Sequence, residues 1–423
     1  MLKKSNAWLW IPTLYFASGL PYHAITSISD IMYKDMGISN ARIALYTSIL
    51  LMPWTIKPLW SPIVEMAGTR RKWTLVSQLL LAVSFAAIAL AIPSAHFLPL
   101  TLAALLAGAF VSSTHDIALD GFYILGLPQE EQSFFSGIRN TFYRIATVFS
   151  SGILVMLANS LGQYLSSEPL AWSATFATTG IIMLALWFYH SKTMPIPKND
   201  TPRTIKSIRN LLSDYGDIIK SYFGKPGIKQ ALLFLLLFRF PEAQLAKMGK
   251  LFLMDDATNG GLALDKGEIG FIYGVIGVVG LIIGGIAGGI CISRKGLKSW
   301  LWPMVIAISL PDAVYIYMSA ALPDNLAAIG SCIFIEQMGY GFGFTAYTLY
   351  MIYFAQGSYP TAHFAISTAF MSLGMMIPGM FAGTLEEWMG YENFFIWVTA
   401  CTIITFAVSA LIKIDPNFGK KQN

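Results

Sequence analysis

The sequence of 423 residues is poor in charge, because only 12% of its residues are Asp, Glu, Lys or Arg. A soluble chain usually has about twice that fraction. Its three cysteines, Cys291, Cys332 and Cys401, lack the spacing of a metal site or a disulfide framework. The HExxH, GxSxG and Walker-loop patterns of common enzymes are also absent. These absences exclude redox and zinc functions of the usual kinds and argue against an enzyme.

Long apolar runs occur along the whole chain, which is 55% hydrophobic and has a mean hydropathy of +0.58. A run of about 20 apolar residues can cross the bilayer core as a helix. The sequence therefore predicts an all-α integral membrane protein with twelve transmembrane helices. The first run follows Lys3 and Lys4 and exceeds a signal-peptide core in length, so we expect a retained helix. The approximate ranges are 7–33, 42–66, 73–94, 97–127, 132–164, 170–190, 228–254, 267–292, 300–321, 325–356, 362–388 and 393–413.

Basic residues are unevenly distributed between the two sides of the predicted membrane. If both termini are cytoplasmic, most of the 28 Lys and Arg residues fall in cytoplasmic segments. This asymmetry is the positive-inside pattern, which predicts the orientation of a membrane protein. It also explains the net charge of +5 without a nucleic-acid partner. The basic residues expected on the opposite side are Lys34, Arg42, Lys247, Lys250 and Lys266.

The chain divides at residues 191–226, between two sets of six predicted spans. This segment contains the charged stretch TIKSIRNLLSDYGDIIKSYF, whose apolar residues have helical spacing. The spacing predicts an amphipathic helix on the cytoplasmic membrane face, and a solvated linker is the alternative. The second and eighth spans open similarly, with MGISNARIALYTSILL and LALDKGEIGFIYGVIG. We therefore expect two pseudo-symmetric six-helix bundles, residues 1–190 and 227–423, with a binding cavity between them.

Several segments within the predicted spans have distinctive sequences: LYFASGLP (14–21), LMPWTIKPLWSPIVE (51–65), DIALDGF (116–122), YRIA (143–146), RFPE (239–242) and EQMGYGFG (336–343). They resemble the muropeptide permease (AmpG-type) branch of the major facilitator superfamily, the last two more thinly. The resemblance implies the major facilitator fold and proton-driven uptake of peptidoglycan-derived amino sugars across a bacterial inner membrane, as in peptidoglycan recycling. Related branches carry other saccharides or acyl-coenzyme cargo.

Two aspartates, Asp116 and Asp120, lie four residues apart in an apolar span and leave the same helix face. A carboxylate at the bilayer centre costs about 2.5–3.5 kcal/mol, so each needs a partner or a purpose. The loop LPQEEQ joins this span to the next one. Asp120 and Arg139 lie at similar distances from this loop, and so do Asp116 and Arg144, so we expect these two pairs. We expect the first to be a structural ion pair. We expect the deeper pair, which matches the family motif, to couple proton movement to transport, and a purely structural pair is the alternative.

A set of polar residues within the spans is expected to contact the substrate. Lys57 lies between two prolines and should face the cavity, although snorkelling to the interface is the alternative. Arg239 and Glu242 are three residues apart, so they can instead pair with each other. Glu336 opens a glycine-rich run in the tenth span. The expected substrate contacts are Lys57, Tyr143, Arg239, Glu242, Glu336 and Gln337.

The loop motif VEMAGTRRK resembles the gating loop of the superfamily, with Glu65 in place of the usual aspartate. Arg70, Arg71 and Lys72 supply its basic cluster. The motif predicts charge contacts that hold one face closed during alternating access. Solvated positive-inside charge explains the basic residues equally well.

The acids within the spans outnumber the cations by one. The acids are Asp116, Asp120, Glu242, Asp312 and Glu336, and the cations are Lys57, Arg139, Arg144 and Arg239. One carboxylate is thus left without a fixed partner, which makes it a natural site for a transported proton. Asp312, beside Pro311, is expected to be structural or interfacial.

Together these features predict a secondary transporter that imports an amino-sugar or muropeptide-like saccharide with protons. It should act as a monomer in the bacterial inner membrane, with both termini cytoplasmic, no cofactor or metal, and no nucleic-acid partner. An importer of other oligosaccharides or small organic anions is the alternative. A membrane-embedded enzyme and a channel fit the paired charges and the repeated halves less well.

Overall fold

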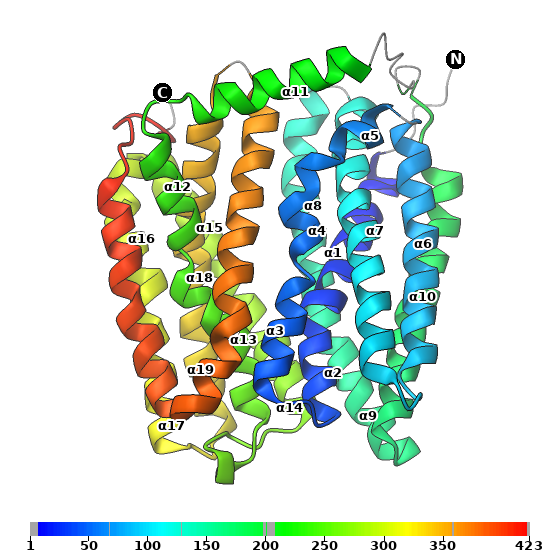
Figure 1. Ribbon diagram of the computed structural model, residues 1–423, viewed down its shortest axis with the longest axis vertical. Helices are drawn as coiled ribbons and strands as arrows, with labels where there is room; N and C mark the ends of the chain where they lie inside the picture. Colours follow the sequence, from blue (N-terminus) through cyan, green and yellow to red (C-terminus); the bar gives the residue numbers. More distant parts are fainter. Residues whose placement is uncertain are drawn as a thin grey trace. The chain divides into compact units, whose positions relative to one another are not determined.

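The computed structural model describes residues 7–66, 68–127, 129–197, 200, 208–357 and 359–420 (Figure 1). These residues form helices and connecting loops and contain no strand, so the all-α prediction is confirmed. Within these ranges the helices group into twelve consecutive segments plus one helix in the predicted linker.

The first six segments are built from α1 to α10. They are α1 (Ile11–His23) with η2 (Ala24–Ile28) and α2 (Ser29–Asp35); α3 (Asn40–Ile49) with α4 (Met52–Ile56), η3 (Lys57–Leu59) and α5 (Ser61–Met66); α6 (Arg70–Ala91); α7 (Phe97–Gly126); α8 (Gln129–Val148) with η4 (Phe149–Leu154) and α9 (Val155–Leu165); and α10 (Glu168–Thr193).

The remaining segments follow α11 (Ile208–Phe223). They are α12 (Ile228–Leu237) with α13 (Phe240–Met254); α14 (Lys266–Phe271) with η6 (Ile272–Gly277) and α15 (Val278–Lys295); α16 (Leu297–Ser309) with η7 (Leu310–Asp312) and α17 (Ala313–Ala321); α18 (Leu326–Ala355); and the two parts of α19 (Pro360–Leu411). Gly390 divides α19, since its φ of 75° and ψ of 162° are not helical.

Seven helices in the described part of the chain are long and apolar enough to cross a membrane. The segments 11–35, 40–66, 228–254 and 326–355 are not among these seven. Two of them contain a break beside a proline, which lacks an N–H and clashes with the preceding turn. Pro21 precedes the π-helical η2, and Pro241 follows the break between α12 and α13.

Contacts divide the chain into two compact units. The first unit is Met1–Met36 with Ile56–Ile205, and the second is Gly37–Thr55 with Lys206–Asn423. The segment predicted as a single helix at 42–66 is therefore broken, with α3 in the second unit and α5 in the first. The prediction of bundles at 1–190 and 227–423 did not include the assignment of residues 37–55 to the second unit. For the other residues, these bundle boundaries stay a prediction.

The first unit packs α1 against α8, and α6 against both α7 and α10. Trp10, Leu14 and Phe122 are buried in its core. The rings of Trp10 and Phe122 meet edge to face, with centroids 5.2 Å apart. This packing fixes the start of α1 against α7, which carries Asp116 and Asp120.

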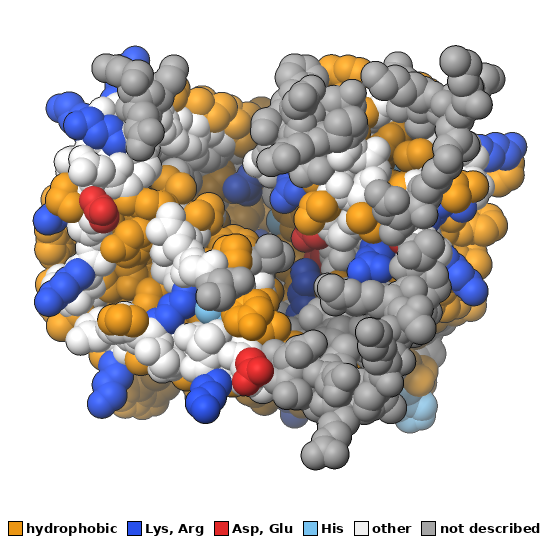
Figure 2. Space-filling view, turned by 90° about the horizontal axis from the view of Figure 1, so that it is seen from above, with side chains coloured by type: hydrophobic (Ala, Val, Ile, Leu, Met, Phe, Trp, Pro, Cys, Tyr) orange, Lys and Arg blue, Asp and Glu red, His pale blue; other side chains and the backbone are white. Residues whose placement is uncertain are grey.

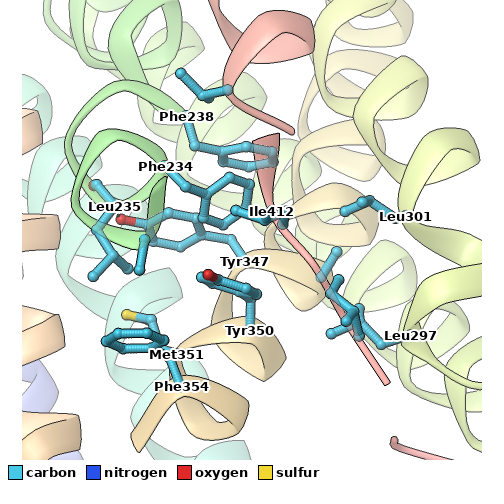
Figure 3. Close-up of a cluster of buried hydrophobic side chains, with 14 of the residues drawn as sticks. Phe234, Leu235, Phe238, Leu297, Leu301, Tyr347, Tyr350, Met351, Phe354 and Ile412 are labelled. Atoms are coloured by element: carbon cyan, nitrogen blue, oxygen red, sulfur yellow. Dashed lines mark hydrogen bonds between the residues drawn. The ribbon is translucent and has the colours of Figure 1, made fainter. Parts of the chain in front are cut away.

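The second unit has an aromatic core between α12, α16 and α18 (Figure 3). Phe238 and Tyr347 stack with ring centroids 5.1 Å apart, and Phe234 lies 4.7 Å from Tyr350. The buried hydroxyl of Tyr347 donates to the carbonyl of Leu235 and is thereby satisfied. Tyr347 and Tyr350 are therefore packing residues.

The glycine-rich run of α18 also serves packing. A Cβ on Gly341 would collide with the backbone of Leu281 in α15, and one on Gly339 or Gly343 would collide with α16. Small residues let helix backbones approach closely, which is how membrane helices gain contact area. The run EQMGYGFG thus holds α18 between its two neighbours.

The helix α11 lies within the predicted linker and runs across the ends of the helices of the second unit (Figure 1). Its C-terminal part docks through polar contacts. Ser221 Oγ lies 2.9 Å from His363 Nε2, Tyr222 Oη lies 3.0 Å from Ser367 Oγ, and Lys225 Nζ donates to the Gln356 carbonyl at 2.8 Å. Figure 2 shows this end of the molecule, where Lys and Arg side chains are spread over the described surface and acidic ones are sparse.

Candidate functional site

In the first unit, Arg139 of α8 contacts Asp120 and two tyrosines. Its Nη1 atom lies 3.9 Å from Asp120 Oδ1 and donates to Tyr15 Oη at 3.2 Å. The guanidinium also lies over the rings of Tyr15 and Tyr123, at 5.0 and 5.1 Å from their centroids. Arg139 is thus positioned by α1 and α7 together.

The contact between Asp120 and Arg139 is long and open to water. The side chain of Arg139 is 32% exposed and that of Asp120 is 56% exposed. Exposed ion pairs contribute at most about 1 kcal/mol. The predicted pair is therefore present but adds little stability, and it leaves the carboxylate accessible to a proton or a substrate.

Asp116 has a different environment from Asp120. Its Oδ1 atom accepts a hydrogen bond from Ser18 Oγ of α1, at 2.7 Å. Arg144 is half-buried and interacts electrostatically with Tyr143, as Asp116 does. Asp116 therefore links α7 to α1, and its predicted coupling role stays a prediction.

Lys57 begins the 3-10 helix η3 and is half-buried. It interacts electrostatically with Asp120, which places a second cation near that carboxylate. Tyr143 lies with its ring centroid 5.9 Å from that of His23, and Thr147 Oγ1 lies 2.8 Å from His23 Nε2. The structure thus brings Lys57 to the Asp120 group and gives Tyr143 contacts with α1.

The predicted gating loop is anchored mainly through its backbone. The N–H groups of Arg70 and Arg71 donate to the two carboxylate oxygens of Asp200, at 2.7 and 3.0 Å, and Lys72 N donates to Thr69 Oγ1 at 3.1 Å. The first N–H groups of a helix lack partners inside it, so these oxygens cap α6. The Arg71 guanidinium also donates to the Ser191 carbonyl at 2.7 Å. The side chain of Glu65 lies outside the described residues.

A chain of buried polar groups crosses the first unit and was not predicted. Thr13 Oγ1 lies 2.9 Å from His190 Nε2, His190 Nδ1 lies 3.0 Å from Gln78 Oε1, and Gln78 Nε2 lies 3.2 Å from His115 Nε2. This series of hydrogen-bonded side chains ends at His115, which precedes Asp116 in the sequence. The available signal was the presence of histidines within otherwise apolar spans.

In the second unit, Arg239 lies at the break between α12 and α13 and is buried. Its Nη2 atom donates to Tyr340 Oη, and its guanidinium lies 4.9 Å from the centroid of Phe344. Cation–π contacts of this kind are strongest when the cation is shielded from water. Arg239 is thus held by α18.

Three buried acids meet beside Arg239. Glu242 of α13, Asp312 of η7 and Glu336 of α18 each offer a carboxylate oxygen, and these atoms all lie within 4.8 Å of one another. Gln337 Nε2 donates to both oxygens of Glu336, at 3.2 and 3.0 Å. Two of the predicted substrate contacts are thus brought together with Asp312, which was expected to be structural or interfacial.

A polar cluster at Asn40 joins α3 to α13 and α19 within the second unit. Asn40 Nδ2 lies 2.7 Å from Glu386 Oε2, 2.9 Å from Tyr391 Oη and 3.1 Å from Asp255 Oδ2. Tyr391 Oη also donates to Asp255 Oδ2 at 2.6 Å. We call these four residues the Asn40 clasp.

Two lysines expected on the outer side of the membrane are buried in α13 instead. Lys247 is 8% exposed and Lys250 is 4% exposed. Lys247 Nζ donates to Thr47 Oγ1 of α3 at 2.8 Å, which satisfies part of the buried ammonium. Both lysines therefore lie within a helix, and the side of the membrane toward which they lie stays a prediction.

A cavity of about 830 Å³ lies between α14, η6 and the start of α18. Its lining is mainly apolar and includes Phe271, Ile276 and Phe334. It contains none of the predicted site residues.

Comparison with known proteins places these features in a family. A family model described as Major Facilitator Superfamily matches residues 13–383. The anhydromuropeptide permease of Escherichia coli strain K12 is 26% identical over 396 residues, which cover 92% of this chain and 76% of the permease. A transporter designated AmpG 4 from Rickettsia conorii is also 26% identical, with 91% of each chain covered.

Solved structures share the fold at low identity. The nucleoside transporter NupG has a TM-score of 0.70 at 15% identity, over 97% of this chain and 100% of that one. A D-xylose-proton symporter has a TM-score of 0.67 at 11% identity, over 98% and 99% of the two chains. At these identities the match concerns the fold alone.

Proposed function

Because the chain belongs to the Major Facilitator Superfamily, we propose that it imports a muropeptide-like amino saccharide with protons, by alternating access. It is a multi-pass membrane transporter of a small molecule. The observation that carries the finer proposal is its similarity to an anhydromuropeptide permease over 92% of its length. We further propose a bacterial inner-membrane location, cytoplasmic termini and a monomer.

Asp116 and Asp120 of the first unit have surroundings that suit the coupling of proton movement to substrate transport. Asp116 accepts a hydrogen bond from Ser18, so protonation of the carboxyl would alter a contact between α7 and α1. The half-exposed Asp120, with Arg139 and Lys57 near it, offers charges that an anionic substrate can reorganise. Substrate charge and proton occupancy would then act on the same set of helices.

Transport into proteoliposomes tests the proposal directly. We expect a labelled anhydromuropeptide to accumulate under an inward proton gradient and to stop accumulating when an ionophore collapses the gradient. A panel of amino sugars, neutral oligosaccharides and small organic anions separates the proposed substrate from the alternatives. Accumulation that ignores the gradient for every substrate would refute proton coupling, and accumulation of neutral oligosaccharides alone would refute the substrate class.

Lys57→Gln tests the anionic contact. We expect a higher KM for the muropeptide with little change in the rate at saturating substrate, because a charge that contacts substrate and transition state equally affects binding alone. Lys220→Gln is the matched control, since Lys220 is an exposed residue of α11. Equal effects of the two changes would remove Lys57 from the site.

A further inference from the structure

The three acids Glu242, Asp312 and Glu336, here called the acidic triad, form the most unusual group in the second unit. Their exposed fractions are 5%, 2% and 2%, and they come from three separate elements. Carboxylates that share a water-poor site repel one another, so they cannot all be ionised at once. The geometry therefore requires a positively charged ligand at the triad.

The fixed charges nearby supply only part of that requirement. Among the described residues, the cation that interacts with the triad is Arg239, which acts on Glu242. Tyr315 of α17 also interacts electrostatically with all three acids, and it is not a cation. One guanidinium balances one carboxylate, so two negative charges remain to be neutralised.

Unsatisfied atoms point to a ligand that is small and exchangeable. Glu242 Oε2 and Asp312 Oδ1 are buried, and neither has a hydrogen-bond partner among the described residues. Buried polar atoms are almost always satisfied, so such exceptions mark a missing ligand or a functional site. Glu336 differs, because the Gln337 amide donates to both of its oxygens.

A proton fits this arrangement better than a metal ion. Hard divalent cations are surrounded by oxygen ligands. The neighbouring Gln337 turns its NH₂ group, not its oxygen, toward Glu336, so this amide does not act as a ligand there. Carboxyl groups in contact can instead share protons among themselves.

We propose that the acidic triad is a proton-binding site of the second unit, which holds two protons at neutral pH and releases one during the transport cycle. The inference rests on the proposed function for its place in transport, and it adds a site distinct from Asp116. Release would restore repulsion between α13, η7 and α18, so proton occupancy would set how closely these elements pack.

Infrared spectroscopy tests the protonation without any substrate. The purified full chain in lipid at neutral pH is compared with Asp312→Asn and Glu242→Gln, each checked for folding by size exclusion and thermal unfolding. We expect each change to remove intensity from the band of protonated carboxyl groups. Glu386→Gln is the matched control, because Glu386 is a buried acid that accepts a hydrogen bond from Asn40, and it should leave the band unchanged.

A folded pair of triad variants that leaves the band intact overturns the proposal. Addition of Ca²⁺ or Mg²⁺ to the unmodified chain is the second measurement. Loss of the band together with a higher unfolding temperature on metal addition would show a metal site and also overturn the proposal. A carboxyl band that is unchanged after metal addition supports the proposal that the triad binds protons.

Transport measurements then test the release step. In proteoliposomes we expect Asp312→Asn to lose gradient-driven uptake while counterflow exchange persists. Retention of driven uptake by the folded variant would overturn the release step. If no saccharide is transported by the unmodified chain, the proposed function fails, yet the infrared result still decides whether the triad holds protons.

Discussion

Replacement of Asn40 by alanine is the sharpest test of how the second unit is held together. The Nδ2 atom has three acceptors within 3.1 Å, but an amide carries only two hydrogens, so two hydrogen bonds exist at a time. One of them ends on the carboxylate of Glu386. Hydrogen bonds contribute about 0.5–1.5 kcal/mol each and those to charged groups about 1.5–3 kcal/mol.

The expected loss for Asn40→Ala is therefore about 2–4 kcal/mol of unfolding free energy. The loss in unfolding free energy is not larger, because Asp255 still accepts the hydrogen bond from Tyr391, at 2.6 Å, in the variant. The assay is denaturant unfolding of the purified protein in detergent, followed by tryptophan fluorescence. Glu386→Gln should reduce the effect of a second change at Asn40, since the two residues interact directly.

Asn393→Ala provides the control for this measurement. Asn393 lies in α19, as Glu386 does, and donates to a backbone carbonyl, Met389 O at 2.9 Å, but the contact is exposed. We expect a loss below about 0.5 kcal/mol there, as for most surface substitutions. Equal destabilisation by the two changes would refute the view that the Asn40 clasp is a buried, charge-assisted network.

Three further outcomes follow from the structure. Asp116→Asn should abolish gradient-driven uptake while counterflow remains, and driven uptake that survives would exclude Asp116 from coupling. Asp200→Ala should lower the unfolding free energy by about 0.5–2 kcal/mol through loss of the α6 cap, and Asp217→Ala, at an exposed position of α11, should not. Gly341→Val should reduce the yield of folded protein more than Gly289→Val, because a Cβ at Gly341 meets α15 and one at Gly289 meets open space.

The number and type of helices could be predicted from the sequence because apolar length is a strong local signal. Charged groups such as Asp116 and Arg139 stood out for the same reason, since charge is rare in an apolar span. The aromatic and glycine residues of α18 gave an ambiguous signal. Their types fit sugar binding as well as packing, and only the contact of Gly341 with α15 decides between the two.

Partnerships between distant residues could not be predicted. Asp200 lies 130 residues from Arg70, and Asn40 lies 346 residues from Glu386. Neither pair has a local pattern, because the fold alone brings the members together. Glu242 and Glu336 were recognised singly as polar residues in spans, but their meeting with Asp312 depends on the 3-10 interruption at η7.

The placement of α3 in the second unit sets an order on the synthesis of the protein. Residues 37–55 leave the ribosome early, while Glu386 and Tyr391, their partners in α19, are among the last to be made. At about 5–20 residues per second, this interval is roughly 20–70 s. During that time α3 must reside in the membrane without the contacts that Asn40 later makes with Glu386 and Tyr391 of α19. A nascent chain stalled before α19 should therefore be the form most exposed to quality-control proteases.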